Sequence, residues 1–337
     1  MTWLERSWYN NSKVVFLMAP LSVLFYLVSL IRKTLYKFGI KKQNDFSVPV
    51  IVVGNINVGG TGKTPFVIYL IELLKTQGFR PAIVSRGYGS EQDQSLPYPR
   101  LVTPKIDVRL SGDEPKLLAI KTQCPVVISA NRSEAVNFAI KEVACDVVIS
   151  DDGLQHYAMS RAIEIVLVDA KRQFGNGWLL PVGPLRELPN RLDSVDLVVK
   201  NLGFIDPKVD EGKDINDYTL AAYEATHLTD PIKVLDKKSK VHLVSGIGNP
   251  ERFLSTVEGL GYQVIETHWF ADHHKFTLAD FEQFDDSDLI LMTEKDAVKC
   301  RELQQGDIGF NWYELPIKAV LSKPVEQKLL ELITQLK

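Results

Sequence analysis

The stretch GNINVGGTGKTP, residues 54–65, nearly matches the phosphate-binding pattern G-x-x-x-x-G-K-[ST], with Asn57 in the place of the first glycine. The apolar run VPVIVVGN ahead of it predicts a strand, and PFVIYLIELLKTQG after it predicts a helix. A glycine loop with a lysine is persuasive only between a strand and a helix, and this loop meets that condition. It therefore predicts a three-layer α/β domain of the P-loop NTPase type.

The loop has the groups that hold a nucleotide. Its backbone N–H groups can surround a β-phosphate, and Lys63 can bridge β- and γ-oxygens while Thr64 places its hydroxyl on Mg²⁺. Glycines occupy the crowded part, where a Cβ would collide with phosphate, and Asn57 at the mouth tolerates left-handed backbone. The predicted nucleotide-binding residues are Asn57, Val58, Gly59, Gly60, Thr61, Gly62, Lys63 and Thr64.

A second feature concerns the metal. The run CDVVISDD ends an apolar strand with Asp151 and Asp152, and P-loop enzymes hold Mg²⁺ with a carboxylate at the end of such a strand. We therefore expect Thr64, Asp151 and Asp152 to form or orient the Mg²⁺ shell. Which aspartate binds directly stays open, and a solvated turn is the other interpretation of Asp152.

Composition limits the class of protein. The 337 residues are 45% apolar and 24% charged, which suits about two globular domains. The net charge of −3 gives no support for a nucleic-acid partner. Three cysteines without CxxC spacing suggest neither disulfides nor zinc and fit a reducing cytoplasm.

The N-terminal region is unusually apolar. Residues 14–31 carry no charge and would form a helix of about 27 Å, borderline for crossing a bilayer. Pro20 weakens the start of that helix, and Ser22 lies on a polar-capable face with Tyr26 and Ser29. A basic flank at 32–42 suits anionic lipid, so a helix lying in the membrane is favoured over a spanning helix, a cleaved signal peptide or a buried core helix.

Four regions follow along the chain. Residues 1–44 are predicted to form a membrane-associated helix with its basic flank, and residues 45–200 are predicted to form the P-loop domain. The polar stretch 201–240 is predicted to be a linker with two extended strands. Residues 241–337 then repeat strand, turn and helix and are predicted to form a smaller α/β domain.

Two classes of protein share these parts: phosphotransferases and membrane-cycling ATPase switches. The deviant loops of such switches carry a lysine before the paired glycines, where this chain has Val58. An alcohol acceptor needs a group to take its proton. Candidates are the turn SGDEP, which contains Asp113, and the run DHH, which contains His273 and His274; a solvated turn is the other interpretation of each.

A set of ordered motifs makes the prediction specific. They are NVGGTGKTP (57–65), SRGY (85–88), GDEP (112–115), DDGLQH (151–156), LLPVGPLRE (179–187) and TEKDAVK (293–299). Together, over the whole chain, they resemble the tetraacyldisaccharide 4'-kinase family of Gram-negative lipid A synthesis, which also lacks the first P-loop glycine.

The resemblance implies that the γ-phosphate of ATP passes, with Mg²⁺, to the 4'-hydroxyl of a tetraacylated glucosamine disaccharide 1-phosphate, giving lipid IVA. It implies work at the cytoplasmic face of the inner membrane, on a lipid acceptor. It also implies an acid–base pair of Asp113 with a DHH histidine, His273 being preferred over His274. Residues that could line the acceptor, nucleotide or phosphoryl sites are Tyr88, Arg132, His156 and Arg186, with Glu294, Lys295 and Asp296 near the ribose or base.

Overall fold

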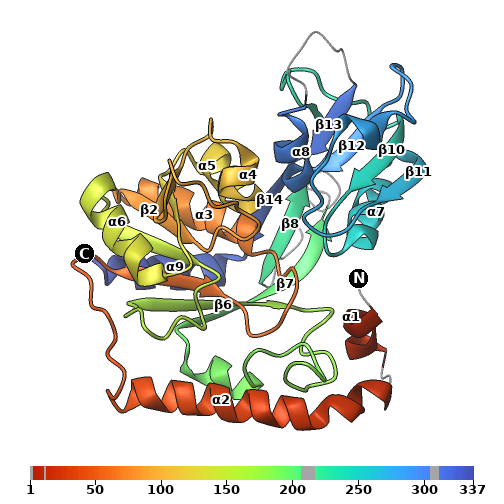
Figure 1. Ribbon diagram of the computed structural model, residues 1–337. Helices are drawn as coiled ribbons and strands as arrows, with labels where there is room; N and C mark the ends of the chain where they lie inside the picture. The colour runs from red at the N-terminus through yellow and green to blue at the C-terminus, as the bar shows by residue number, and fades with distance from the viewer. Residues whose placement is uncertain (1–2, 11–12, 206–216, 304–310) are drawn as a thin grey trace.

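Two sheets organise the molecule, each with helices on its faces (Figure 1). The computed structural model describes residues 3–10, 13–205, 217–303 and 311–337. The predicted class is confirmed: the fold is α/β, with a large, mostly parallel sheet and a smaller one.

The larger sheet has nine strands in the described residues, and β1 lies between β5 and β6 near its centre. Only the strands at its two edges, β3 and β14, pair antiparallel with their neighbours. β1 and β5 are buried throughout, as their unbroken apolar runs predict for a sheet covered on both faces. The spatial order is β14 (Ile317–Leu321), β8 (Tyr218–Ala222), β7 (Leu197–Ile205), β6 (Ile163–Asp169), β1 (Val50–Gly54), β5 (Val147–Asp151), β2 (Pro81–Ser85), β4 (Val126–Ile128) and β3 (Arg100–Val102).

Helices cover both faces of this sheet. One face packs against apolar residues of α3, α5 and α9, and the other against α6 and the loops that follow β5 and β6. The helices in the described residues are α1 (Trp3–Tyr9), η1 (Lys13–Met18), α2 (Ala19–Lys37), α3 (Lys63–Thr76), α4 (Val108–Ser111), α5 (Asp113–Thr122), α6 (Arg132–Val143), η2 (Pro189–Ser194), α7 (Pro250–Gly259), η3 (Leu278–Phe281), α8 (Glu294–Cys300) and α9 (Lys323–Thr334).

The smaller sheet has α7 on one face and α8 with η3 on the other. Helix α8 also contacts α5 of the larger domain, so the two domains meet along these two helices. The strand order is β11 (Gln263–Trp269), β10 (Lys240–Ser245), β12 (Ile290–Thr293), β13 (Trp312–Leu315) and β9 (Thr226–His227).

The chain between the two sheets differs from the expected linker. Its two described strands join different sheets: β8 extends the larger sheet and β9 the smaller, while 206–216 lie outside the described residues. The last strand and helix also differ from the expected C-terminal domain. β14 pairs with β8, and apolar residues of α9 enter the core of the larger domain, so the chain ends on the larger domain. The other domain boundaries stay predictions.

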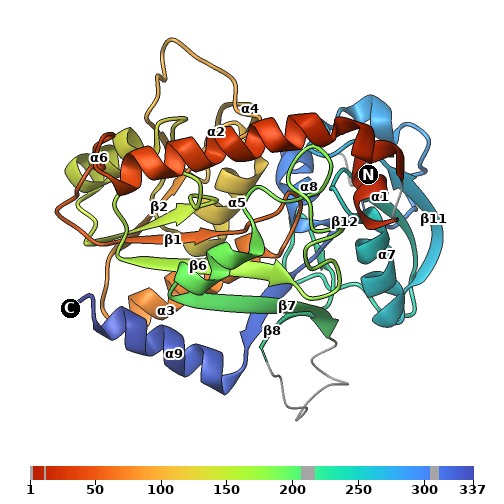
Figure 2. The same cartoon turned by 90° about the horizontal axis from the view of Figure 1, so that it is seen from below.

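Helix α2 runs along the outside of the larger domain (Figures 1 and 2). Residues 13–37 have a mean hydropathy of 2.5 in their most apolar window, yet only 11% of that window is buried, which contradicts the buried core helix. Pro20 lies in the first turn of α2, where a missing N–H does no harm. Ser22 is buried and turns toward the protein, where its hydroxyl donates to the carbonyl of Leu179 (2.8 Å) and accepts from the N–H of Val182.

Candidate active site

The phosphate loop and the paired aspartates meet at one edge of the larger sheet. β1 and β5 are parallel neighbours in which Val53 lies opposite Asp151. The loop leaves the carboxyl end of β1 and enters α3 at Lys63, and Asp151 ends β5. The adjacency that the sequence predicts for loop and carboxylates is therefore present, at the strand ends where open α/β sheets bind ligands.

Asn57, at the missing-glycine position, has a different role from the one expected. It is not among the described residues with positive φ, so its tolerance of left-handed backbone is not used. Instead it forms a β-bridge with Leu185, and its side-chain amide donates to the carbonyl of Gln173 (3.2 Å). Asn57 therefore ties the phosphate loop to the segment that contains LLPVGPLRE.

The end of the phosphate loop is supported by β7 and β8. Asn201 donates through Nδ2 to the carbonyl of Thr61 (2.9 Å), and the Tyr218 hydroxyl donates to that of Gly62 (2.9 Å). Gly62 has φ of 85°, and a Cβ there would collide with Asn201 Nδ2. Position 62 therefore requires glycine for two reasons: the backbone has a positive φ, and the Asn201 side chain occupies the space that a Cβ would fill. Asn201 and Tyr218 carry no motif, so the sequence did not reveal them.

The two aspartates have different surroundings. Lys63 Nζ lies 3.3 Å from Asp152 Oδ1, and Arg186 donates to the same carboxylate (3.0 Å). Burial opposes ionisation of Asp152, but these two cations hold its pKa below the ordinary value. Burial, together with the charge of Glu114, raises the pKa of Asp151. Asp151 Oδ1 is shut off from solvent without a hydrogen-bond partner in the described residues, so it can accept a cation.

Three cationic or ionisable groups lie beside these carboxylates. Arg132 is buried at the start of α6 and donates to the carbonyls of Ser129 and Asp151 (2.8 and 3.3 Å), and burial lowers its pKa to about 10. Burial and the charge of Arg132 lower the pKa of His156 to about 4, with Arg86 adding to the effect. His156 is therefore neutral at pH 7. Arg86 belongs to the SRGY motif, in which the sequence assigned no role to this position, and it is exposed directly after β2.

Asp113 and His273 come together from the two domains. Asp113 begins α5, His273 follows β11, and His273 Nδ1 lies 2.9 Å from Asp113 Oδ2. Burial would raise the pKa of Asp113, but His273 and Lys295 together lower it to about 2. The hydrogen bond to Asp113 raises the pKa of His273. Gly112 makes this turn possible: its φ is 81°, and a Cβ there would lie 2.5 Å from the Tyr88 carbonyl.

The neighbouring histidine has another partner. His274 Nε2 lies 3.2 Å from Asp280, and its ring stacks on Phe270 with centroids 4.5 Å apart. Tyr88 is 65% exposed, and its ring centroid is 5.0 Å from that of His273. The geometry therefore brings His273, but not His274, together with Asp113 and Tyr88.

The acidic and basic residues of TEKDAVK contact other parts of the protein. Glu294 pairs with Lys121, and Lys295 lies 2.8 Å from Glu114, so both bridge α8 to α5. Asp296 is fully buried, accepts hydrogen bonds from the hydroxyls of Ser245 and Thr293, and forms an ion pair with Lys299. Their contacts place them in the domain interface and the core of the smaller domain.

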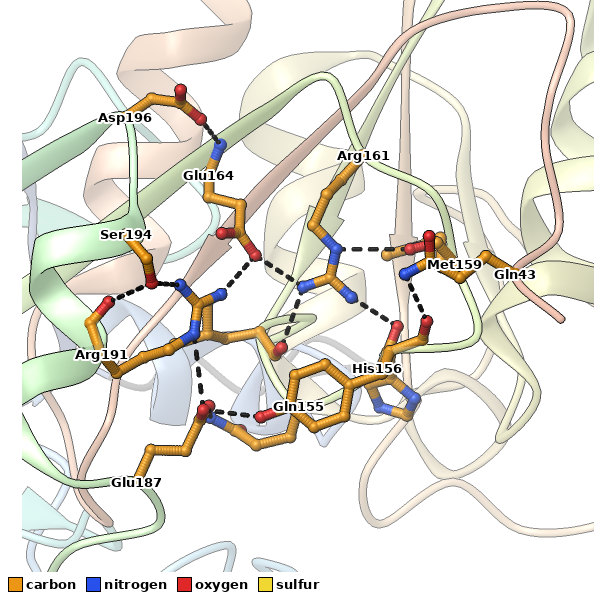
Figure 3. Close-up of polar contacts among 12 residues, drawn as sticks. Gln43, Gln155, His156, Met159, Arg161, Glu164, Glu187, Arg191, Ser194 and Asp196 are labelled. Atoms are coloured by element: carbon orange, nitrogen blue, oxygen red, sulfur yellow. Dashed lines mark hydrogen bonds and ion pairs between the residues drawn. The ribbon is translucent and has the colours of Figure 1, made fainter. Parts of the chain in front are cut away.

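A polar network that includes Gln155 and Glu187 lies beside the site (Figure 3). Gln155 donates to Glu187 (2.9 Å) and to the carbonyl of Asn55, and Glu187 also accepts from the Tyr157 hydroxyl (2.6 Å). The Tyr157 ring in turn lies 6.3 Å, centroid to centroid, from Tyr36 of α2. Through these contacts the loop that follows Asp152 is joined to the apolar helix.

A glycine loop between β1 and α3, an adjacent buried carboxylate, and an Asp–His pair define a P-loop phosphotransferase. A family model described as tetraacyldisaccharide-1-P 4'-kinase matches residues 14–334. The chain belongs to this family, and the membership predicted from its motifs is confirmed.

Similar proteins align with this chain over nearly its whole length. The tetraacyldisaccharide 4'-kinase of Mannheimia succiniciproducens is 46% identical, with 94% of each chain covered. That of Pasteurella multocida is also 46% identical, with 93% of each covered. A crystal structure of LpxK from Aquifex aeolicus in complex with ATP superimposes with a TM-score of 0.74 at 29% identity, covering 96% of this chain and 99% of that one.

Proposed function

We propose that the protein transfers the γ-phosphate of ATP to the 4'-hydroxyl of a tetraacylated glucosamine disaccharide 1-phosphate, forming lipid IVA. Family membership and the names of the relatives support the reaction. The observation that carries it is the Asp113–His273 pair, since a phosphotransferase with an alcohol acceptor needs a proton acceptor and a switch that hydrolyses ATP needs none of this kind.

The nucleotide is held by the loop that ends β1. Backbone N–H groups of residues 59–62 surround the phosphates, and Lys63 bridges the β- and γ-oxygens. The N–H of Val58 donates to the carbonyl of Pro184 (2.8 Å) and so supports the loop instead. Thr64, Asp151 and Asp152 would hold Mg²⁺, which neutralises charge on the phosphates. The unpartnered oxygen of Asp151 fits this group, because a buried carboxylate without a hydrogen bond is stabilised by a cation. Asp152, tied to Lys63 and Arg186, orients that lysine.

His273 acts as the general base. Nδ1 of His273 faces Asp113, so Nε2 is the nitrogen that accepts the proton of the 4'-hydroxyl as the hydroxyl oxygen bonds to the γ-phosphorus and ADP leaves. Asp113, ionised at pH 7, then stabilises the imidazolium. The pair is already formed without a nucleotide, so closure of the two domains on ATP would bring it to the γ-phosphate and would not be needed to assemble it.

The remaining site residues handle charge and the acceptor. Arg132 and Arg186, beside Asp151 and Asp152, stabilise negative charge on the phosphoryl group or the acceptor's 1-phosphate, and exposed Arg86 joins them. Tyr88, exposed and packed on His273, and neutral His156 line the acceptor side.

The protein acts at the cytoplasmic face of the bacterial inner membrane, with α2 lying in the interface. Support comes from the exposed apolar side chains of α2, among them Leu24 (58% exposed) and Val28 (57%), and from its basic C-terminal flank. The double substitution Leu24→Glu with Val28→Glu should abolish flotation with vesicles containing anionic lipid while leaving thermal unfolding unchanged. Retained flotation would contradict this placement.

A transfer assay tests the reaction. Purified wild type and Asp113→Ala are given ATP, Mg²⁺ and the tetraacyl disaccharide in detergent, and chloroform-soluble phosphorylated lipid and free phosphate are measured separately. The proposal predicts labelled lipid with wild type and a severe loss with the variant. Free phosphate alone would support the membrane-cycling ATPase instead, and a fully active Asp113→Ala would overturn the base assignment.

A further inference from the structure

A second cluster of ionisable side chains lies on the smaller sheet, outside the phosphate site. It consists of His242 on β10 and of Glu266 and His268 on the neighbouring edge strand β11. One ring nitrogen of each histidine and a carboxylate oxygen all lie within 4.8 Å of one another. Two neutral imidazoles and a carboxylate at this spacing are a set that binds a transition metal.

A β-bulge creates this arrangement. The pairing of β10 with β11 shifts register between Val241 and His242, so that His242 lies opposite Glu266 and Ile265 has no partner. Without the shift, His242 would lie opposite Ile265, and the carboxylate would point to the other face. Because alternate residues of a strand share a face, the bulge puts Glu266 and His268 on the face of His242.

The ring nitrogens are poorly satisfied without an ion. Nδ1 of His242 and Nε2 of His268 are shut off from solvent, and no hydrogen-bond partner for either is found among the residues that the structure describes. Burying such atoms unpaired is unfavourable. The Phe284 ring packs edge-on against both imidazoles, with centroids 5.2 and 4.8 Å away, and limits their rotation.

We propose that His242, Glu266 and His268 bind one divalent transition-metal ion, with Zn²⁺ the best match, and water in the remaining position. Two nitrogen ligands and a single carboxylate favour zinc over magnesium or calcium, which prefer oxygen ligands. Asp288 Oδ1, 3.7 Å from His242 Nε2, is placed to orient that ring as an outer partner. The bound ion joins the edge strand β11 to β10, and β11 leads directly to the turn that carries His273.

Metal titration tests the proposal. Full-length protein without a histidine tag is stripped with a chelator, dialysed and titrated with Zn²⁺ by calorimetry, without nucleotide. A separate sample of the stripped protein is given Co²⁺ in place of Zn²⁺, and its visible absorption is recorded. We expect one ion per chain, ligand-field bands from Co²⁺, and a higher thermal midpoint with Zn²⁺. His242→Ala and His268→Ala should each weaken binding at least about tenfold, and Glu266→Gln should weaken it less.

Matched histidine variants separate this cluster from other sites. His227→Ala, on β9, and His273→Ala, in the Asp113 pair, should keep the ion and its affinity. If His242→Ala or His268→Ala fails to fold, the Zn²⁺ affinity of Glu266→Gln is the deciding measurement. The Glu266 side chain is 63% exposed, so replacing it does not disturb the core. Equal Zn²⁺ binding by wild type and Glu266→Gln, or loss of the ion in His273→Ala, would overturn the proposal.

Discussion

The phosphate loop and the Asp113–His273 pair are built in different ways. The loop and its carboxylates leave adjacent parallel strands of one sheet, so their spacing is set by strand pairing within a single core. Asp113 and His273 lie in different domains, and their 2.9 Å contact depends on how α5 and α8 pack together. The half proposed to hold the nucleotide is therefore preformed within one core, while the half proposed to transfer the proton depends on the relative position of two domains.

The largest effect is expected in the preformed half. Lys63→Ala removes the cation that we propose to bridge the β- and γ-phosphates, and we expect the rate of phosphoryl transfer to fall by about 10³. The fold should persist, because Arg186 still pairs with Asp152. The assay is lipid phosphorylation at saturating ATP, with the exposed lysine variant Lys141→Ala as the control. A fall of less than tenfold would show that the loop does not act through Lys63.

The next prediction concerns the half that spans the domains. His273→Ala should lower the rate by about 10², the usual contribution of a general base. The pH profile is more specific: His273 accepts a proton only when neutral, so the rate falls as pH drops below its pKa. The hydrogen bond to Asp113 raises that pKa above the ordinary histidine value, so Asp113→Asn should move the acid limb to lower pH as well as reduce the maximum rate. An unmoved acid limb would assign it to another group.

Sequence alone predicts the preformed half better than the other. Parallel strands bring their carboxyl ends to one edge of a sheet, so the two strand-ending motifs suffice to place Asp151 beside the loop. The support from Asn201 and Tyr218 is not predictable in this way, because these residues lie far along the chain in a stretch without a motif. The sequence of β14 also does not show that this strand belongs to the larger sheet, because its apolar pattern would suit either sheet.

A smaller effect is expected from the support of the loop. Tyr218→Phe removes the hydroxyl that donates to the Gly62 carbonyl but keeps the ring, which packs edge-on against Phe66 at 5.7 Å. Loss of about 1 kcal/mol corresponds to a roughly fivefold higher KM for ATP. The control is Tyr223→Phe, on the exposed end of the same region. A change in the KM for lipid alone would show that the hydroxyl does not act through the loop.

The smallest effect separates the two adjacent histidines. The sequence favours His273 over His274 only slightly. In the structure His273 contacts Asp113 of the larger domain, whereas His274 contacts Asp280 within the smaller domain. His274→Asn removes a partly exposed hydrogen bond to Asp280 and touches no reacting group, so activity should fall less than about threefold. The acid limb of its pH profile should coincide with that of wild type. If His274→Asn lost activity as His273→Ala does while unfolding at the wild-type temperature, the base would be His274, and the two domains would have to close in a different arrangement.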